Sequence, residues 1–349
     1  MNRRLSKEIR IGNVTIGGNH PIAIQSMLNT PSRDTEGCVA QAKRLEEAGC
    51  EIIRVAVPDA DCVRTVGALK EAVAIPVVAD IHFDYKLALE CAAAGVDKIR
   101  INPGNIGADE RVKAVADECA RRGIPIRIGV NSGSLEKHIL EKYGAPTPEA
   151  LVESALYHCE LLEKFDFDNI VISIKSSDVK RTVESYRLAA EKVPYPLHLG
   201  VTEAGTERMG LIKSAAGIGS LLMDGIGDTI RVSLTADPEQ EIYAAKDILN
   251  AIGLGRGGVR FVSCPTCGRT EIDLIGIAGE VERRLRGCEK NITVAVMGCV
   301  VNGPGEAREA DIGIAGGKGC GILFKKGEIV RKVPENELVD ALMEEIENL

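Results

Sequence analysis

The sequence is poor in aromatic residues, has no excess of basic charge and contains no long apolar run, and each deficit excludes a class of protein. Phe, Trp and Tyr make up 3% of the 349 residues, so few side chains could stack on nucleic-acid bases. The formal net charge of −8 argues against a general affinity for nucleic acid or anionic lipid. No apolar run reaches the length of a membrane span. We therefore expect no nucleic-acid partner and no membrane.

The N-terminal stretch MNRRLSKEIRIGN is charged and lacks the apolar core of a secretory signal, so we expect a cytoplasmic protein. Disulfides are rare in the cytoplasm, so the eleven cysteines need another explanation. Several lie in Ala- and Leu-rich stretches with helical spacing, which is typical of small buried core residues: Cys38, Cys50, Cys91, Cys119 and Cys159.

Short β-branched runs alternate with longer amphipathic stretches from residue 22 to about residue 252. This alternation predicts βαβ units and a parallel sheet. The runs are IAIQSM, EIIRVAVP, IPVVADIH, DKIRINPG, IPIRIGVN, NIVISIKS, PLHLGVTE and DTIRVSLT. Eight such units favour a closed (β/α)₈ TIM-type barrel over a doubly wound open sheet. After a Gly-rich linker, mixed strand and helix patterns predict a small α+β domain. We expect the barrel at residues 1–253 and the second domain at residues 259–349.

The predicted barrel strands carry polar residues at alternating positions, whereas parallel strands are usually apolar throughout. Because helices cover the outer face, these side chains point inward, near the mouth formed by the carboxyl ends of the strands. The cations of this face are Arg54, Arg100, Arg127, Lys175 and Arg231. Such a cluster indicates a di- or polyphosphorylated small molecule. The alternative is a network neutralised by Asp80 and Glu203, but too few carboxylates lie in register for that.

Two residues at the ends of the predicted strands have an open assignment. Glu203, in GVTEAG, is either a proton donor in cationic surroundings or a surface loop residue. His82 is either part of the site or a strand-end histidine that bonds to a backbone carbonyl.

Two motifs in the predicted second domain supply thiols: SCPTCGR, and MGCVVNGPGEAR about thirty residues later. Cys264 and Cys267 form a C-x2-C pair, and Cys299 lies among glycines that allow the backbone close to an inorganic centre. Glu306 follows the tight turn and can reach back toward Cys299. Three thiolates and one weak oxygen ligand would hold a [4Fe–4S] cluster with one replaceable corner, as catalysis requires.

A closed zinc site is the main alternative for these thiols. Cys288 would be the fourth ligand, but its spacing from Cys299 is too wide for a zinc knuckle and its surroundings are polar. Cys320 is another conceivable fourth thiol. A redox dithiol is disfavoured because the pair does not cap a βαβ unit. The rival functions are therefore a phosphosugar lyase or isomerase with a structural zinc site, and a zinc-ribbon interaction protein.

The ordered motifs resemble one enzyme family over essentially the whole chain: IQSMLNT, IIRVAVP, VADIHFD, KIRINPGN, RIGVNSGSL, GVTEAG, IRVSLT, SCPTCGR and MGCVVNGPGEA. They are similar to the 4-hydroxy-3-methylbut-2-enyl diphosphate synthases of isoprenoid biosynthesis, in the bacterial two-domain form. The resemblance implies reductive ring opening and dehydroxylation of 2-C-methyl-D-erythritol 2,4-cyclodiphosphate. It also implies a [4Fe–4S] cluster and two electrons delivered singly by flavodoxin or ferredoxin.

The resemblance implies residue roles as well. Cys264, Cys267, Cys299 and Glu306 would bind the cluster, and Glu203 would donate a proton. The substrate would be bound by Arg54, His82, Arg100, Asn102, Arg127, Asn131, Lys175, Arg231 and Ser233. Because the short linker leaves the barrel on the side opposite the mouth, we expect a homodimer in which each cluster domain covers the partner's mouth.

Overall fold

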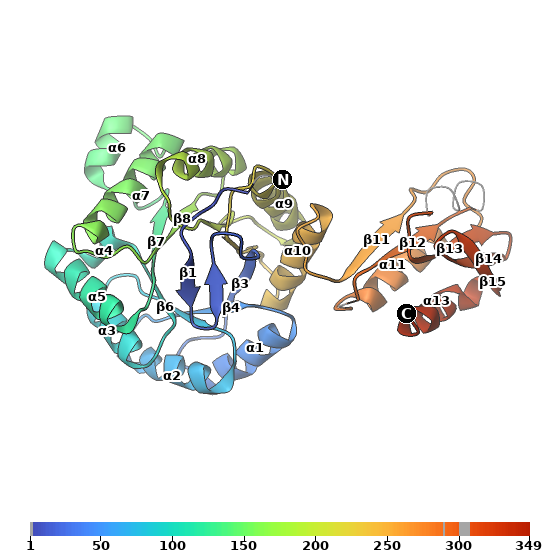
Figure 1. Cartoon of the computed structure of the whole chain (residues 1–349), viewed down its shortest axis with the longest axis horizontal. Coiled ribbons are helices and arrows are strands. Elements are labelled where there is room, and N and C mark those ends of the chain that lie inside the picture. Colours follow the sequence, from blue (N-terminus) through green and yellow to red (C-terminus); the bar gives the residue numbers. More distant parts are fainter. Residues whose placement is uncertain (1–2, 289, 300–307) are drawn as a thin grey trace. The chain divides into compact units, whose positions relative to one another are not determined.

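The computed structural model describes residues 3–288, 290–299 and 308–349. The chain divides into two compact units, one ending at Ile252 and one running from Gly253 to Leu349. Figure 1 shows strands ringed by helices in the first unit and a sheet with helices in the second. None of the helices in the described part of the chain combines the length and apolar character that a membrane crossing requires.

The first unit alternates strands and helices. Its strands are β1 (Ile9–Ile11), β2 (Val14–Ile16), β3 (Ala23–Met27), β4 (Ile52–Ala56), β5 (Val77–Asp80), β6 (Lys98–Ile101), β7 (Ile126–Asn131), β8 (Ile170–Lys175), β9 (His198–Leu199) and β10 (Thr229–Ile230). Its helices are α1 (Thr35–Glu47), η1 (Ala60–Cys62), α2 (Val63–Ala72), α3 (Tyr85–Ala93), α4 (Pro103–Ile106), α5 (Asp109–Arg122), α6 (Lys137–Tyr143), α7 (Pro148–Glu163), α8 (Val179–Lys192), α9 (Glu207–Met223) and α10 (Pro238–Ala251).

Strands β3 to β10 form a parallel barrel. They lie in the order β8-β7-β6-β5-β4-β3-β10-β9. The two ends of this order meet through a parallel bridge between Ile172 and Leu197, and Ile172 N donates to Pro196 O at 2.9 Å. The predicted TIM-type barrel is therefore confirmed.

The last two barrel strands are shorter than the sequence pattern predicts. The apolar runs at 196–203 and 228–235 suggest full strands, but the ladder retains only His198–Leu199 and Thr229–Ile230. Beyond the ladder the two segments pass close together, because a Cβ on Gly200 would lie 2.9 Å from Arg231 O. Glu203 and Ser233 consequently belong to loops at the mouth.

An N-terminal hairpin, not anticipated from the sequence, closes the end at which the barrel strands begin. β1 and β2 pair antiparallel around Gly12, whose φ of 55° suits glycine. Isoleucines of this hairpin pack against the first inward side chains of the barrel strands; the cluster comprises Ile9, Ile11, Ile16, Ala23, Ile52, Val78 and Val171. With this end plugged, the opposite mouth is the place for a site.

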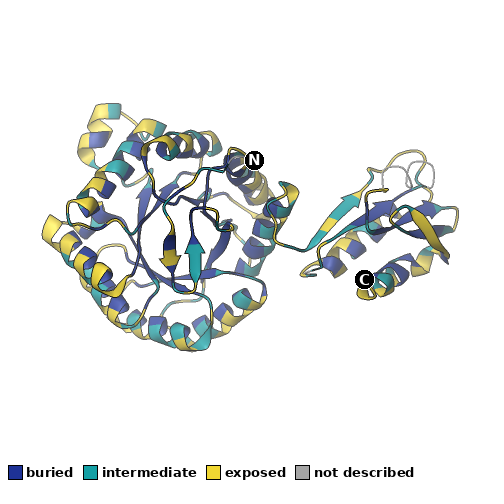
Figure 2. Cartoon of the chain, in the orientation of Figure 1, coloured by how far each residue is buried: buried dark blue, intermediate teal, exposed yellow. Residues whose placement is uncertain are grey.

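The helices begin next to that mouth, and several of them are capped by side chains of the preceding loops. Asp34 accepts from Gly37 N, Asp178 accepts from Arg181 N, and Thr147 accepts from Ala150 N. Figure 2 shows the pattern that follows, with buried strands inside and helices that expose only their outer faces. This arrangement fixes the loops that carry the polar side chains.

The second unit is a mixed sheet covered on one face by helices, in agreement with the α+β pattern expected. Its strands are β11 (Val259–Ser263), β12 (Ile292–Met297), β13 (Ile312–Gly317), β14 (Cys320–Lys325) and β15 (Glu328–Pro334), and its helices are α11 (Leu274–Leu285), η2 (Glu335–Glu337) and α13 (Leu338–Glu347). The strands lie in sequence order, and β11, β12 and β13 run parallel to one another. β14 runs antiparallel to β13, and β15 runs antiparallel to β14. α11 begins at Leu274, where Asp273 caps it by accepting from Gly276 N.

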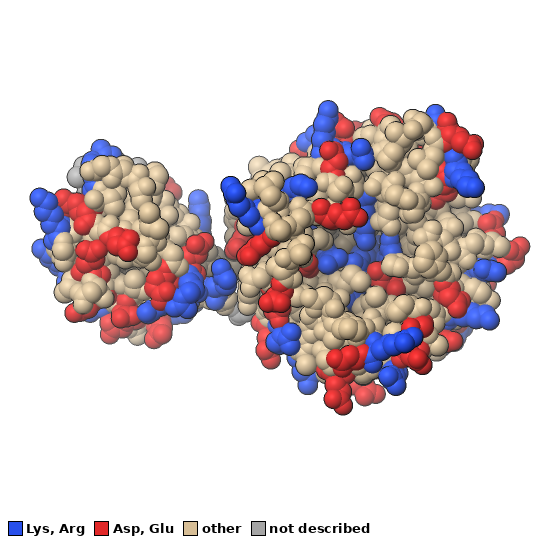
Figure 3. Space-filling model, turned by 180° about the vertical axis from the view of Figure 1, so that it is seen from behind, with Lys and Arg blue, Asp and Glu red and all other residues tan. Residues whose placement is uncertain are grey.

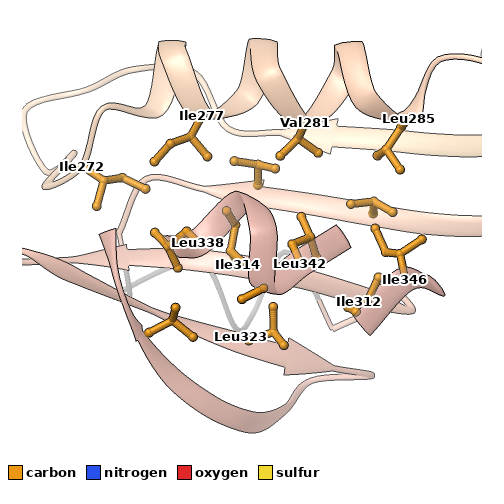
Figure 4. Packing of buried hydrophobic residues seen from close by; sticks show 14 of the residues in the cluster. Ile272, Ile277, Val281, Leu285, Ile312, Ile314, Leu323, Leu338, Leu342 and Ile346 are labelled. Atoms are coloured by element: carbon orange, nitrogen blue, oxygen red, sulfur yellow. The ribbon is translucent and has the colours of Figure 1, made fainter. Parts of the chain in front are cut away.

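The core of the second unit follows the alternation of its strands. Figure 4 shows Val281 of α11 and Leu342 of α13 packed with Ile314 of the sheet. The alternate strand residues, such as Met297 and Phe324, form a smaller cluster on the other face. The unit thus has a core of its own.

Candidate active site

The mouth of the barrel is a hollow lined by cations. Figure 3 shows the face behind that of Figure 1, with Lys and Arg atoms inside the hollow. Arg54, Arg100 and Arg127 are buried there, although they belong to three different strands, β4, β6 and β7. Arg100 is the ladder partner of both Asp80 on β5 and Arg127 on β7, so their side chains share one inward face.

Asp80 is the acidic centre of this cluster. Its carboxylate lies 3.0 Å from Arg100 Nη1 and 3.8 Å from Arg54 Nε. His82 Nε2 lies 3.6 Å from the same group but is more than half exposed. Burial alone opposes ionisation of Asp80, yet Arg54, His82 and Arg100 together hold its pKa well below the ordinary value. Asp80 is therefore ionised, and its ion pairs hold Arg54 and Arg100 in place.

The cations of the barrel outnumber the carboxylates that neutralise them. In the described part of the chain their ion-pair partners are Asp80 and Glu241, the latter 3.3 Å from Arg231. None of the three side-chain nitrogens of Arg127 has a hydrogen-bond partner among the described residues, and the same holds for Lys98 Nζ. Buried donors without acceptors are costly, and an anionic ligand would supply the acceptors that this layer lacks.

The lowered pKa values of the buried cations also favour a site for an anion. Burial, and then mutual repulsion among the cations, lowers the pKa of Lys98, Arg127 and Lys175 well below their ordinary values. Burial also lowers the pKa of Arg54 to about 10. An anion in the hollow would relieve both effects, because it supplies hydrogen-bond acceptors and opposite charge.

Most of the other predicted residues of the mouth lie nearer to solvent. Asn102 is buried and half-buried Asn131 ends β7, while Lys175 ends β8 with a half-buried side chain. Ser233 is half-buried in the loop after β10. Glu203 is exposed and has a φ of 51°. A non-glycine residue in the left-handed region is held there at a cost in conformational energy, and such residues cluster at functional sites.

Sequence reasoning missed two residues of this lining. Gln25 lies inside the barrel on β3, and neither of its amide atoms has a partner within the described ranges. Glu241 is buried on α10 and faces Arg231. A signal for Glu241 was present, because it lies on the apolar stripe of its helix with Ile242, Ala245 and Ile248.

The absence of a side chain at Gly129 makes room for Arg100. Arg100 Nη2 donates to Gly129 O at 3.3 Å, and a Cβ at Gly129 would overlap the guanidinium. We expect Gly129→Ala to displace Arg100 and weaken phosphate binding by about 1–3 kcal/mol, the range for overpacking. Calorimetric titration checks this, with Gly67→Ala as control, because a Cβ there meets nothing within 4 Å. Equal affinity in both variants would contradict it.

The thiol residues lie at the carboxyl edge of the second sheet. Cys264 follows β11 and Cys299 follows β12, which is the parallel neighbour of β11. Gly298 N donates to Cys264 Sγ at 3.1 Å, and Glu271 N donates to Gly298 O at 3.1 Å. The loop with the C-x2-C pair therefore lies against the segment that leads into Cys299. The backbone N–H of Arg269 is the main cause of a lowered pKa at the exposed Cys267 thiol.

The two remaining candidate thiols, Cys288 and Cys320, lie toward opposite ends of the strands. Cys288 precedes β12 and lies toward the opposite edge, so the length of a strand, roughly 16 Å, separates it from Cys264. Cys320 begins β14 opposite Gly317, at the same edge as Cys264. Glu306 lies outside the described residues. Among the residues described, no group of three or more His, Cys, Asp or Glu side chains is arranged to hold a metal ion.

Comparisons with known proteins agree with both units. Residues 6–246 match the GcpE TIM-barrel domain, and residues 260–348 match the GcpE protein C-terminal domain. A protein of Clostridium perfringens named 4-hydroxy-3-methylbut-2-en-1-yl diphosphate synthase (flavodoxin) is 60% identical over 349 residues, which cover 100% of both chains. A protein of the same name from Geobacter sulfurreducens is 57% identical over 344 residues, 99% of this chain and 98% of the relative.

Two solved structures each match about 70% of this chain. Yersinia pestis dihydropteroate synthase has a TM-score of 0.51 at 14% identity and covers 70% of this chain and 98% of its own. 3-Dehydroquinate dehydratase of Geobacillus kaustophilus has a TM-score of 0.52 at 13% identity, over 72% of this chain and 98% of its own. These likenesses establish the fold only. The domain matches and the full-length identity show that this chain belongs to the GcpE family.

Proposed function

We propose that this chain converts 2-C-methyl-D-erythritol 2,4-cyclodiphosphate to 4-hydroxy-3-methylbut-2-enyl diphosphate, by reductive ring opening and loss of one hydroxyl oxygen as water. The relatives carry the name of the corresponding synthase over their full length. The observation that carries the proposal is the layer of buried cationic donors without acceptors at the barrel mouth. A cyclic diphosphate supplies the oxygens and negative charge that this layer lacks.

Within this function, the cations of the mouth bind the two phosphates. Arg54, Arg100, Arg127, Lys175 and Arg231 supply charge, while His82, Asn102, Asn131 and Ser233 supply further hydrogen-bonding groups. Asp80 fixes the arginines before the ligand arrives, which reduces the ordering cost of binding. The hairpin β1–β2 excludes solvent from the opposite end of the barrel.

The thiol loops fit an iron–sulfur cluster by donor type. Thiolate sulfur is the usual ligand of such clusters, and a backbone N–H bond to the sulfur, as Gly298 donates to Cys264, is the usual support. We assign Cys264, Cys267 and Cys299 as ligands of a [4Fe–4S] cluster, with Glu306 as the fourth. When bound, the cluster supplies single electrons for reductive C–O cleavage. The separation of Cys288 from Cys264 disfavours the closed zinc site with Cys288 as fourth ligand.

Glu203 is assigned as the proton donor. Its strained backbone at the mouth is the structural support for this role. Glu203→Gln should lower kcat by about 100- to 10,000-fold, the usual contribution of a general acid, and leave substrate affinity nearly unchanged. Steady-state kinetics and calorimetry measure the two quantities. The control is Glu207→Gln, in the first turn of α9. A normal kcat for Glu203→Gln would contradict the assignment.

We further propose a homodimer that shares its sites, with flavodoxin as the electron donor; flavodoxin appears in the names of the relatives. The short linker after α10, on the side of the barrel away from the mouth, supports sites built from two chains. A mixture of Arg231→Ala and Cys299→Ser chains should then regain about a quarter of the wild-type activity, because half of the random pairs are mixed and each mixed pair has one intact site. No recovery after chain exchange would contradict the shared site.

Anaerobic purification followed by iron and sulfide analysis tests the function. The proposal predicts a brown protein that forms the product from the cyclic diphosphate with reduced flavodoxin. A colourless zinc protein without this activity would instead favour a phosphosugar lyase or isomerase with a structural zinc site.

A further inference from the structure

One buried carboxylate of the barrel lies on a helix rather than on a strand. Glu241 is in α10 and is 4% exposed. Its helix starts directly after the loop that follows β10, and it packs against β3. A carboxylate rarely occupies such a position unless it has several strong partners.

Glu241 connects three separate segments of the mouth. Oε2 accepts from Ser26 Oγ on β3 at 3.0 Å, and Oε1 accepts from Leu234 N at 3.1 Å in the loop after β10. The Arg231 guanidinium faces both oxygens, with Nη2 3.3 Å from Oε1 and Nε 3.4 Å from Oε2. This two-point contact fixes the plane of the guanidinium as well as its position.

Arg231 has little else to hold it. Its other hydrogen-bond acceptor in the described part of the chain is Met27 Sδ at 3.8 Å, and a thioether is a weak acceptor. Arg231 is also the more exposed member of the pair, with 21% of its side chain accessible against 5% for Glu241. The buried acid is therefore the fixed partner, and the arginine reaches from it toward the hollow.

We infer that Glu241 is a positioning residue, which holds Arg231 and the loop after β10 in the orientation that binds the phosphate oxygens of the substrate. The inference rests on the proposed function, in which Arg231 binds phosphate. Electrostatic repulsion alone predicts the opposite effect of Glu241 on the affinity for the substrate. A carboxylate near an anionic ligand repels it, so removal of the charge alone would strengthen binding.

The test is titration of the cyclic diphosphate into the full-length protein without reductant. Glu241→Gln keeps the size of the side chain, but its amide nitrogen cannot accept from Arg231, so we expect Kd to rise about tenfold, as for one lost charge-assisted bond. Glu241→Asp keeps the charge and shortens the reach, so Kd should rise as well. Glu239→Gln is the matched control, because that residue lies in the first turn of the same helix but pairs with the exposed Arg44 of α1. An unchanged or lower Kd for Glu241→Gln or for Glu241→Asp would overturn the inference.

A double-mutant cycle separates positioning from a general structural effect. In an Arg231→Ala background, Glu241→Gln should change Kd less than twofold, because its effect passes through the missing arginine. An equal loss in both backgrounds would refute the positioning role. In turnover assays, Glu241→Gln in the otherwise wild-type protein should raise KM and change kcat less. If Arg231→Ala by itself leaves Kd unchanged, the phosphate assignment fails; if only the Glu241 variants are normal, this inference alone fails.

Discussion

Arg100→Ala should weaken binding of the cyclic diphosphate by about 2–4 kcal/mol, as expected for the loss of a charged hydrogen-bonding group in a buried site. Arg100 is 2% exposed and is held by Asp80 and Gly129, so its orientation is set before a ligand enters. Removal of the guanidinium also removes one of the cations that pair with Asp80. The charge of this carboxylate is then less neutralised and repels the ligand. Titration of the full-length protein without reductant measures the loss.

The control for this variant is Arg187→Ala, which removes an exposed arginine paired with Asp224 on the surface. Its affinity for the substrate and its iron content should equal those of the wild type. Arg100→Ala should likewise retain its iron, because no predicted cluster ligand is changed. Unchanged substrate affinity in Arg100→Ala would remove the phosphate assignment from the barrel mouth.

The inward cations could be predicted because a periodicity and a packing rule combine. Residues two apart on a strand share a face, and the outer face of a parallel barrel is covered by helices. Arg54, Arg100 and Arg127 each interrupt an apolar run at such a position, and the structure buries all three together. The barrel itself follows from the repeated alternation of strand and helix, which leaves few other topologies.

Other features depend on contacts between distant segments, which periodicity does not encode. The hairpin β1–β2 is only a pair of three-residue alternations, and its role appears when Ile9 meets Val78 and Val171. Glu241 is one of two acids in the first turn of α10; its place on the apolar stripe indicates burial, but only the geometry shows that it pairs with Arg231. The ladder between β9 and β10 stops at Leu199 and Ile230 although both apolar runs continue, and the apolar pattern does not mark that end.

Substitution of the cluster ligands should have the largest effects. Cys264→Ser, Cys267→Ser and Cys299→Ser should each lose most of the bound iron and nearly all turnover, because hydroxyl oxygen is a far weaker ligand for a cluster iron than thiolate sulfur. Cys288→Ser should leave both nearly unchanged, because Cys288 lies toward the other edge of the sheet. Cys320→Ser is the stricter control, because Cys320 shares the edge of Cys264.

Glu306 distinguishes a structural ligand from a functional one. A carboxylate binds iron less firmly than a thiolate, so Glu306 would be the ligand that a substrate oxygen displaces most easily. Glu306→Cys should therefore keep or strengthen the brown cluster yet lose most turnover, whereas Glu306→Ala should give a labile cluster that loses iron. Iron and sulfide content, measured beside turnover in each variant, separates these cases. If Cys320→Ser lost its iron while Glu306→Ala retained a normal cluster, the fourth ligand would be a thiol, and the open position would need another explanation.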